Sequence, residues 1–122
     1  MSNTIYQSKI IKIGDFAQDT LKEGMLITFK QGVPEDLADF CFVHTHDNLL
    51  ADLAVGQTLK IGNNICTITA VGEVATTNFK ELGHITIRFD SSDSAELPGN
   101  VHVSGSINND INVDDVISII AD

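Results

Sequence analysis

The sequence predicts an all-β protein, a small antiparallel β-barrel with one or two short helical turns. Turn residues recur about every ten positions in the second half of the chain, and this spacing is typical of small β-sandwiches and β-barrels. Several segments of strand length between them alternate polar and apolar side chains. The connections are short enough for a compact barrel. The turn positions are Gly56, 62–64, Gly72, Gly83, 98–99, Gly105 and 108–110.

The first quarter of the chain predicts two strands. Residues 4–13 are rich in Ile and Thr and stop at Gly14, as a first strand would. Residues 15–23 are polar and ambiguous, and they fit a loop with one helical turn. Residues 25–29 form a compact apolar run of strand length, MLITF. We therefore expect a strand, a polar connection and a second strand.

A short helical turn is predicted over residues 34–39. Pro34 suits the first helical position, and the acidic residues that follow suit the positive end of a helix. This turn is followed by residues 40–47, FCFVHTHD, which we predict to be a strand.

The second half of the chain reads mainly as strands. Residues 57–61 and 65–71 flank a Gly-Asn-Asn turn and predict a hairpin. Residues 76–82 fit another helical turn, whereas residues 84–90 alternate clearly between a polar and an apolar face. Two further strands are predicted over 101–103 and 111–120.

Two of the four histidines, His44 and His46, lie in the predicted strand 40–47. Side chains two apart on a strand share a face and lie roughly 6.5–7 Å apart along it, whereas on a helix they would diverge. Phe40 and Phe42 have the same parity as the histidines. We therefore expect a strand that begins buried and ends at a rim, where an imidazole can meet another molecule.

Three interpretations of the pair follow from the residues alone. A neutral imidazole has one nucleophilic nitrogen and one N–H, which suits reversible phosphoryl acceptance by His44 with His46 as a donor to the phosphoryl oxygens. Two histidines at this spacing also begin many zinc or iron sites, for which Asp47, His84 or His102 would supply a third ligand. The third interpretation is a histidine that only packs or forms hydrogen bonds.

The other candidate side chains have plainer interpretations. His84 and His102 fall on polar faces of their strands and are expected at the surface, unless those faces meet the histidine strand. Cys41 would face away from His44 and is expected to be an inert core thiol. Catalytic triads, phosphate-binding loops and dinucleotide fingerprints are absent, so we predict no cofactor.

Composition limits the classes of partner and compartment. Seventeen acidic against seven basic residues give a net charge of -10, which argues against nucleic acid or an anionic membrane surface and is compatible with a basic protein partner. Two cysteines suggest no disulfide framework. No signal peptide or membrane span is apparent, so we expect a cytoplasmic protein that meets a membrane only through a partner.

Several stretches together resemble the glucitol/sorbitol-specific IIA component of the bacterial phosphotransferase system. The resemblance covers nearly the whole chain, and it implies a single IIA domain over residues 1–122. It rests on residues 34–47, 53–62, 70–75, 81–90 and 98–105.

The resemblance implies a phosphotransferase that works as a phosphohistidine carrier. The matching histidine is His44, which would accept a phosphoryl group from the phosphocarrier HPr and pass it to a cysteine of the IIB component. The IIB and IIC components would then phosphorylate the entering hexitol. Acidic side chains would dock the partners, namely Glu35, Asp36, Asp39 and Asp47. A regulatory relative not coupled to transport, and a metal-binding barrel, remain as alternatives; the exact hexitol, the oligomeric state and the modified nitrogen stay open.

Overall fold

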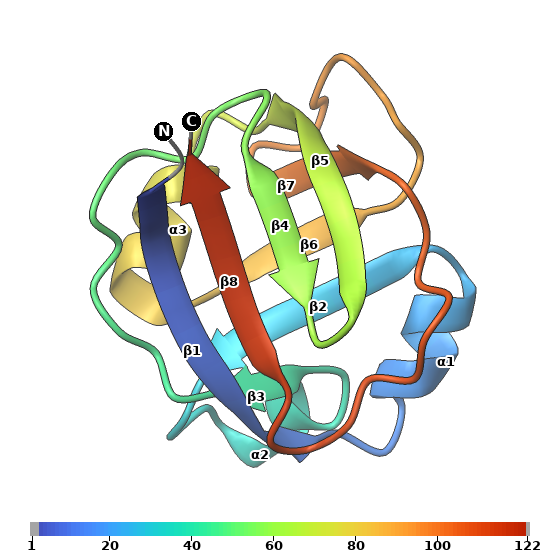
Figure 1. The fold of residues 1–122 in the computed structure, drawn as a ribbon. Helices are drawn as coiled ribbons and strands as arrows, with labels where there is room; N and C mark the ends of the chain where they lie inside the picture. Colours follow the sequence, from blue (N-terminus) through green and yellow to red (C-terminus); the bar gives the residue numbers. More distant parts are fainter. Residues whose placement is uncertain (1–2, 122) are drawn as a thin grey trace.

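A computed structural model describes residues 3–121 and contains eight strands and three helices within them (Figure 1). The strands are β1 (Asn3–Ile13), β2 (Met25–Lys30), β3 (Phe42–His44), β4 (Thr58–Ile61), β5 (Asn64–Val71), β6 (Ile85–Arg88), β7 (Asn100–Ser104) and β8 (Val116–Ala121). The helices are α1 (Ala17–Lys22), α2 (Glu35–Ala38) and α3 (Ala75–Leu82). The all-β prediction is confirmed. The three helices are one more than the one or two helical turns predicted, and they overlap the segments 15–23, 34–39 and 76–82 in which such turns were considered.

Each strand pairs with two neighbours, so the sheet closes into a barrel in the order β1-β3-β2-β6-β7-β5-β4-β8. The purely antiparallel arrangement that we expected needs a correction, because β2 pairs with β3 and β6 pairs with β7 in parallel. Parallel neighbours need a connection that returns the chain to the end from which it started. The segment containing α2 and the long loop over residues 89–99 provide these two returns. The described sheet is therefore mixed.

The barrel interior is filled by alternate side chains of the strands. Large buried residues there include Ile10, Leu26, Phe42 and Ile87, and α3 contributes Phe79. A smaller cluster of Ala38, Cys41 and Val43 lies on the other face of β3, against α2. Cys41 is thus a buried free thiol, as expected, and burial raises its pKa to about 11. The alternation along β3 sends Phe42 and His44 into the barrel.

Two helices lie on opposite sides of the barrel in Figure 1, with α3 at the left near β1 and α1 at the right, beside β2 and the loop that leads into β8. The chain enters α1 through Gly14, where a Cβ would lie 2.1 Å from the carbonyl oxygen of Ala38. Only glycine allows the backbone of β1 to pass this close to α2. This contact holds the start of β3 in place, and β3 then carries His44 toward α3.

Candidate functional site

His44 and His46 lie together at the end of β3, although the strand is shorter than predicted. Regular pairing ends at His44, and the His46 N–H donates to the His44 carbonyl at 3.0 Å in a tight turn. The two ring centroids are 5.9 Å apart and nearly perpendicular. Phe40 precedes the strand and is 48% exposed, so it does not share the buried face as expected. The proximity of the rings is therefore set by a turn as well as by strand parity.

The expected exposed rim is wrong for His44. Its side chain has 0% relative exposure, whereas that of His46 is partly exposed. The ring of Phe79 stacks on His44 with centroids 6.0 Å apart and also contacts Tyr6 at 4.5 Å. His44 is buried because α3 packs across this end of the barrel, and strand alternation alone carries no information about that cover.

The C-terminal end of α3 is fastened to the histidines by its carbonyl oxygens. His44 Nε2 lies 2.8 Å from the Gly83 oxygen, and His46 Nε2 lies 2.8 Å from the Lys80 oxygen. Lys30 Nζ donates to the Glu81 oxygen at 3.3 Å. These helix-end carbonyls lack partners inside the helix. Because a carbonyl oxygen can only accept, each Nε2 carries the hydrogen and each Nδ1 holds a lone pair. We call this set of three bonds the carbonyl clamp.

Two hydroxyl groups of β1 satisfy the Nδ1 lone pairs. Ser8 Oγ lies 2.9 Å from His44 Nδ1, and Tyr6 Oη lies 2.8 Å from His46 Nδ1 and 3.2 Å from His44 Nδ1. A hydroxyl has a single hydrogen, so the arrangement that satisfies both rings has Tyr6 donating to His46 and Ser8 donating to His44. Both imidazoles are thus held in one tautomer and one orientation.

The electrostatics of the site favour a neutral His44. The pKa of His44 is lowered to about 4, chiefly by burial; the hydrogen bond to the Gly83 carbonyl opposes this shift, and the nearby His46 contributes to it. Burial also raises the pKa of the Tyr6 hydroxyl, so Tyr6 remains protonated. At neutral pH the network therefore contains an uncharged, nucleophilic imidazole.

The lowered pKa predicts a specific loss of stability in acid. The unfolded chain takes up the His44 proton near pH 6.5 and the folded chain only near pH 4. The contribution of neutral His44 is therefore complete above about pH 6.5 and is lost as the pH falls toward about 4. The shift corresponds to about 3 kcal/mol. Denaturant unfolding between pH 7 and pH 4 measures this loss, and subtracting the same series for His44→Gln isolates the His44 contribution. An NMR titration that shows His44 protonating near pH 6.5 would contradict it.

Comparison with known proteins identifies the chain. Residues 5–118 match the family model described as the PTS system glucitol/sorbitol-specific IIA component. The chain belongs to this family. It is therefore a component of the phosphotransferase system. Such a component carries a phosphoryl group on a histidine and passes it to a IIB component.

Named relatives and a solved structure agree with this assignment. The chain is 48% identical over 107 residues to the PTS system glucitol/sorbitol-specific EIIA components of Shigella flexneri and of Escherichia coli strain K12, covering 88% of this chain and 87% of each relative. It is also similar to the crystal structure of a PTS system IIA component from Enterococcus faecalis V583, with a TM-score of 0.79 and 26% identity. That similarity covers 91% of this chain and 96% of the other.

The other predicted ligands do not join the histidine pair of this IIA component. His84 Nδ1 donates to the Thr28 carbonyl at 3.0 Å and its ring packs on Phe29, while His102 bonds to Asp90. Asp47 is exposed. Within residues 3–121, no group of three His, Cys, Asp or Glu side chains is placed to hold a metal ion. His102 differs from the expected surface position, since it is only 6% exposed.

The residues that sequence reasoning missed are Tyr6, Ser8, Phe79 and Gly83. Tyr6 and Ser8 are two apart in the first predicted strand, and Tyr6 is the only tyrosine in the chain. The sequence could therefore predict that Tyr6 and Ser8 share a strand face, but it could not predict that this strand pairs with residues 42–44.

No helix of the described residues is long and apolar enough to cross a membrane.

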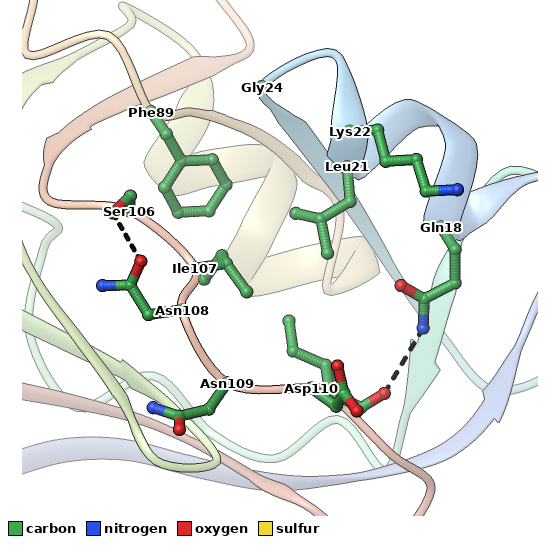
Figure 2. A pocket seen from close by; sticks show the side chains of 11 residues that line it. Gln18, Leu21, Lys22, Gly24, Phe89, Ser106, Ile107, Asn108, Asn109 and Asp110 are labelled. Atoms are coloured by element: carbon green, nitrogen blue, oxygen red, sulfur yellow. Dashed lines mark hydrogen bonds between the residues drawn. The ribbon is translucent and has the colours of Figure 1, made fainter.

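A hollow lies away from the histidines, between α1 and residues 106–111 (Figure 2). Its volume is about 480 Å³, and Leu21, Phe89 and Ile107 give it an apolar side. Gln18 bridges its rim by donating to the Ile111 carbonyl at 3.4 Å. None of its lining residues is a hydrogen-bonding partner or ring neighbour of His44 or His46 in the described part of the chain, so cavity size alone would not have pointed to the histidines.

Proposed function

We propose that His44 accepts a phosphoryl group from phospho-HPr and passes it to a cysteine of the IIB component, within the cytoplasm. The observation that supports this role most directly is that His44 is a neutral imidazole, oriented at both nitrogens by uncharged groups. The transfer needs an in-line nucleophile and donors to the phosphoryl oxygens. No cofactor is invoked.

We propose Nε2 as the accepting atom, because the two nitrogens face different surroundings. Nδ1 faces Ser8 and Tyr6 on β1, a strand paired on both sides, whereas Nε2 faces the turn at Gly83. A partner that moves this turn reaches Nε2 first. Once the Gly83 carbonyl has moved away, Nε2 releases its hydrogen to water and Nδ1 takes one up from water, so that the lone pair lies on Nε2 and the Nδ1 hydrogen is donated to Ser8 Oγ, which accepts as readily as it donates. The N–P bond of phospho-HPr breaks as the bond to Nε2 forms.

His46 and Lys30 are proposed to stabilise the phosphoryl oxygens. In the closed site their donors are occupied by the carbonyls of Lys80 and Glu81. Displacement of the end of α3 frees a His46 N–H and a Lys30 ammonium beside the acceptor. A cation and an oriented N–H are the donors that phosphoryl transfer uses.

The acidic side chains expected to dock the partners remain proposals. Asp47 directly follows the histidine turn and is exposed, and Glu35 and Asp36 are exposed on α2. Asp39 is partly buried. Charge reversal at Asp47 should slow transfer in a salt-dependent way if it faces the basic partner. An unchanged rate would remove it from the interface.

The experiment that tests the function is phosphorylation by phosphoenolpyruvate, Enzyme I and HPr, followed by intact-mass analysis. We expect the gain of a single acid-labile phosphoryl group, and NMR of the phosphorylated protein labelled at histidine nitrogens should place it on Nε2. Adding the IIB component should then discharge it. Failure to label under conditions where HPr is itself phosphorylated would overturn the proposal, and labelling without discharge would favour the regulatory alternative.

A further inference from the structure

The turn that covers His44 is also held from the core side, by a buried threonine. Thr28 lies on β2 and is 1% exposed. Its hydroxyl donates to the Gly83 carbonyl oxygen at 2.9 Å and accepts from the Ile85 N–H at 3.2 Å. The same Gly83 oxygen lies 2.8 Å from His44 Nε2. One carbonyl oxygen therefore joins Thr28 to the imidazole, and both of its lone pairs are in use.

The sheet fixes the Thr28 side chain in this position. Thr28 pairs with Phe42 of β3 on one side and with Ile85 of β6 on the other. A β-branched side chain on a strand has a restricted choice of rotamers. Its single hydroxyl hydrogen goes to the Gly83 oxygen, because the Ile85 oxygen is farther away, at 3.5 Å. The Thr28 hydroxyl therefore cannot follow the Gly83 carbonyl when that carbonyl moves.

The peptide unit between Gly83 and His84 is held less firmly than the Thr28 side chain. Gly83 ends α3 with φ of +60°, and glycine adopts other backbone conformations at little steric cost. The N–H of this peptide unit makes only a long bond, 3.4 Å from the Asn78 carbonyl oxygen. The direction of the Gly83 carbonyl is therefore set mainly by its two donors, Thr28 and His44.

Phosphoryl acceptance and the bond from Thr28 to Gly83 exclude each other. Acceptance at Nε2 of His44 places phosphorus and its oxygens where the Gly83 oxygen lies in the closed site, 2.8 Å from that nitrogen. The carbonyl has to leave, and the fixed Thr28 hydroxyl then loses its acceptor. A buried hydroxyl without an acceptor is unfavourable. The bond therefore stabilises the unphosphorylated protein and not the phosphorylated one.

We propose that Thr28 is a positioning residue, which acts through the Gly83 carbonyl to keep Nε2 of His44 covered until phosphoryl transfer. The effect on transfer rests on the proposed function, whereas the covering of Nε2 does not. Removing the hydroxyl should uncover Nε2 more often and should shift the transfer equilibrium toward the phosphorylated protein. One hydrogen bond is lost in each case, which corresponds to a factor of about three to ten.

Thr28→Val tests the proposal, because valine keeps the shape of threonine and lacks the hydroxyl. In protein labelled at histidine nitrogens, the Nε2 hydrogen of His44 should exchange with water about three- to tenfold faster than in wild type. Backbone amides of β8 report global unfolding, so the ratio of the two exchange rates isolates the local opening. After equilibration with HPr and phospho-HPr, intact-mass analysis should show the equilibrium constant for transfer raised by the same factor.

Three further variants make the test specific. Thr28→Ser keeps the hydroxyl and should stay within about twofold of wild type in both measurements. Thr28→Cys, whose thiol is a weak donor, should change both in the same direction as valine, and it replaces Thr28→Val if that variant does not fold. Thr69→Val is the matched control, because Thr69 Oγ1 donates to a different loop carbonyl, that of Ser92, at 2.6 Å. It should leave both measurements unchanged.

The two measurements can fail separately. Exchange at His44 that rises only in proportion to the β8 amides, or that rises equally in Thr28→Ser, would overturn the positioning role of Thr28. Faster exchange in Thr28→Val with no phosphorylation of wild type would overturn the proposed function and support the covering of Nε2. Faster exchange with an unchanged transfer equilibrium would mean that the bond survives in the phosphorylated protein, which would overturn the effect on transfer.

Discussion

Replacing His44 with glutamine should abolish phosphoryl acceptance from phospho-HPr. Glutamine can still donate to the Gly83 carbonyl and accept from Ser8, the two bonds that orient His44, but its amide nitrogen is not a nucleophile at neutral pH. The variant should therefore keep much of the local packing and lose the chemistry. Intact-mass analysis after incubation with the phosphorylating components measures the loss.

Two matched variants make this result specific. His46→Gln should still be labelled but more slowly, because it removes a donor and leaves the acceptor. His84→Gln should be labelled at the wild-type rate, because His84 bonds to the Thr28 carbonyl outside the network. Labelling of His44→Gln together with loss of labelling in His46→Gln would reverse the assigned roles. Thermal unfolding of all three variants would show whether any loss comes from misfolding.

The substitution Gly83→Ala adds only one methyl group, but it should disrupt the site strongly. Gly83 has φ of +60°, and a Cβ there would lie 2.9 Å from His44 Nε2 and 3.1 Å from His46 Nδ1. The left-handed backbone costs an alanine about 1–2 kcal/mol, and crowding the buried His44 ring and the partly exposed His46 ring costs about 1–3 kcal/mol more. We expect a total loss of about 3 kcal/mol in the free energy of unfolding. Phosphoryl acceptance should fall about tenfold or more, because displaced rings no longer present the acceptor in line.

Gly32→Ala is the control for the backbone contribution. Gly32 has φ of +88°, and no atom lies within 4 Å of the point that a Cβ would occupy, so alanine there bears the conformational cost without the crowding. Denaturant unfolding of the two variants gives the difference directly. Equal destabilisation would mean that the rings move aside freely, and the close approach of Gly83 to His44 would then have no energetic importance.

The strands were largely predictable because alternation is a local property. Residues 84–90 and the hairpin 57–71 were found from period and turn chemistry, and the structure confirms β6 and the β4–β5 pair around Gly62, which has φ of +58°. The last strand starts later than expected, at Val116. The preceding residues form a loop closed by Asp115, whose side chain accepts from the Asn112 N–H.

The position of His44 in the candidate site was predictable, and the surroundings of His44 were not. His44 could be chosen from its place on the predicted strand and from the family resemblance, but its burial depends on Phe79 and Gly83, which lie 35 and 39 positions further along the chain. Likewise, the parallel pairing of β2 with β3 depends on where the segment containing α2 returns the chain. These are tertiary contacts, and no local pattern encodes their partner.

The carbonyl clamp also limits the kind of surface that can open the site. Releasing it removes the protein donors of the Lys80 and Glu81 carbonyls, and it removes the His44 donor of the Gly83 carbonyl, which also accepts from Thr28 Oγ1 at 2.9 Å. Water can solvate the Lys80 and Glu81 oxygens, but an apolar surface that excludes water would leave both unpaired at a cost of about 1–3 kcal/mol each. A partner that displaces the end of α3 in a dry interface must therefore supply its own N–H or O–H donors at that point. Opening is thus an exchange of hydrogen bonds, which discriminates among partners by where their donors lie.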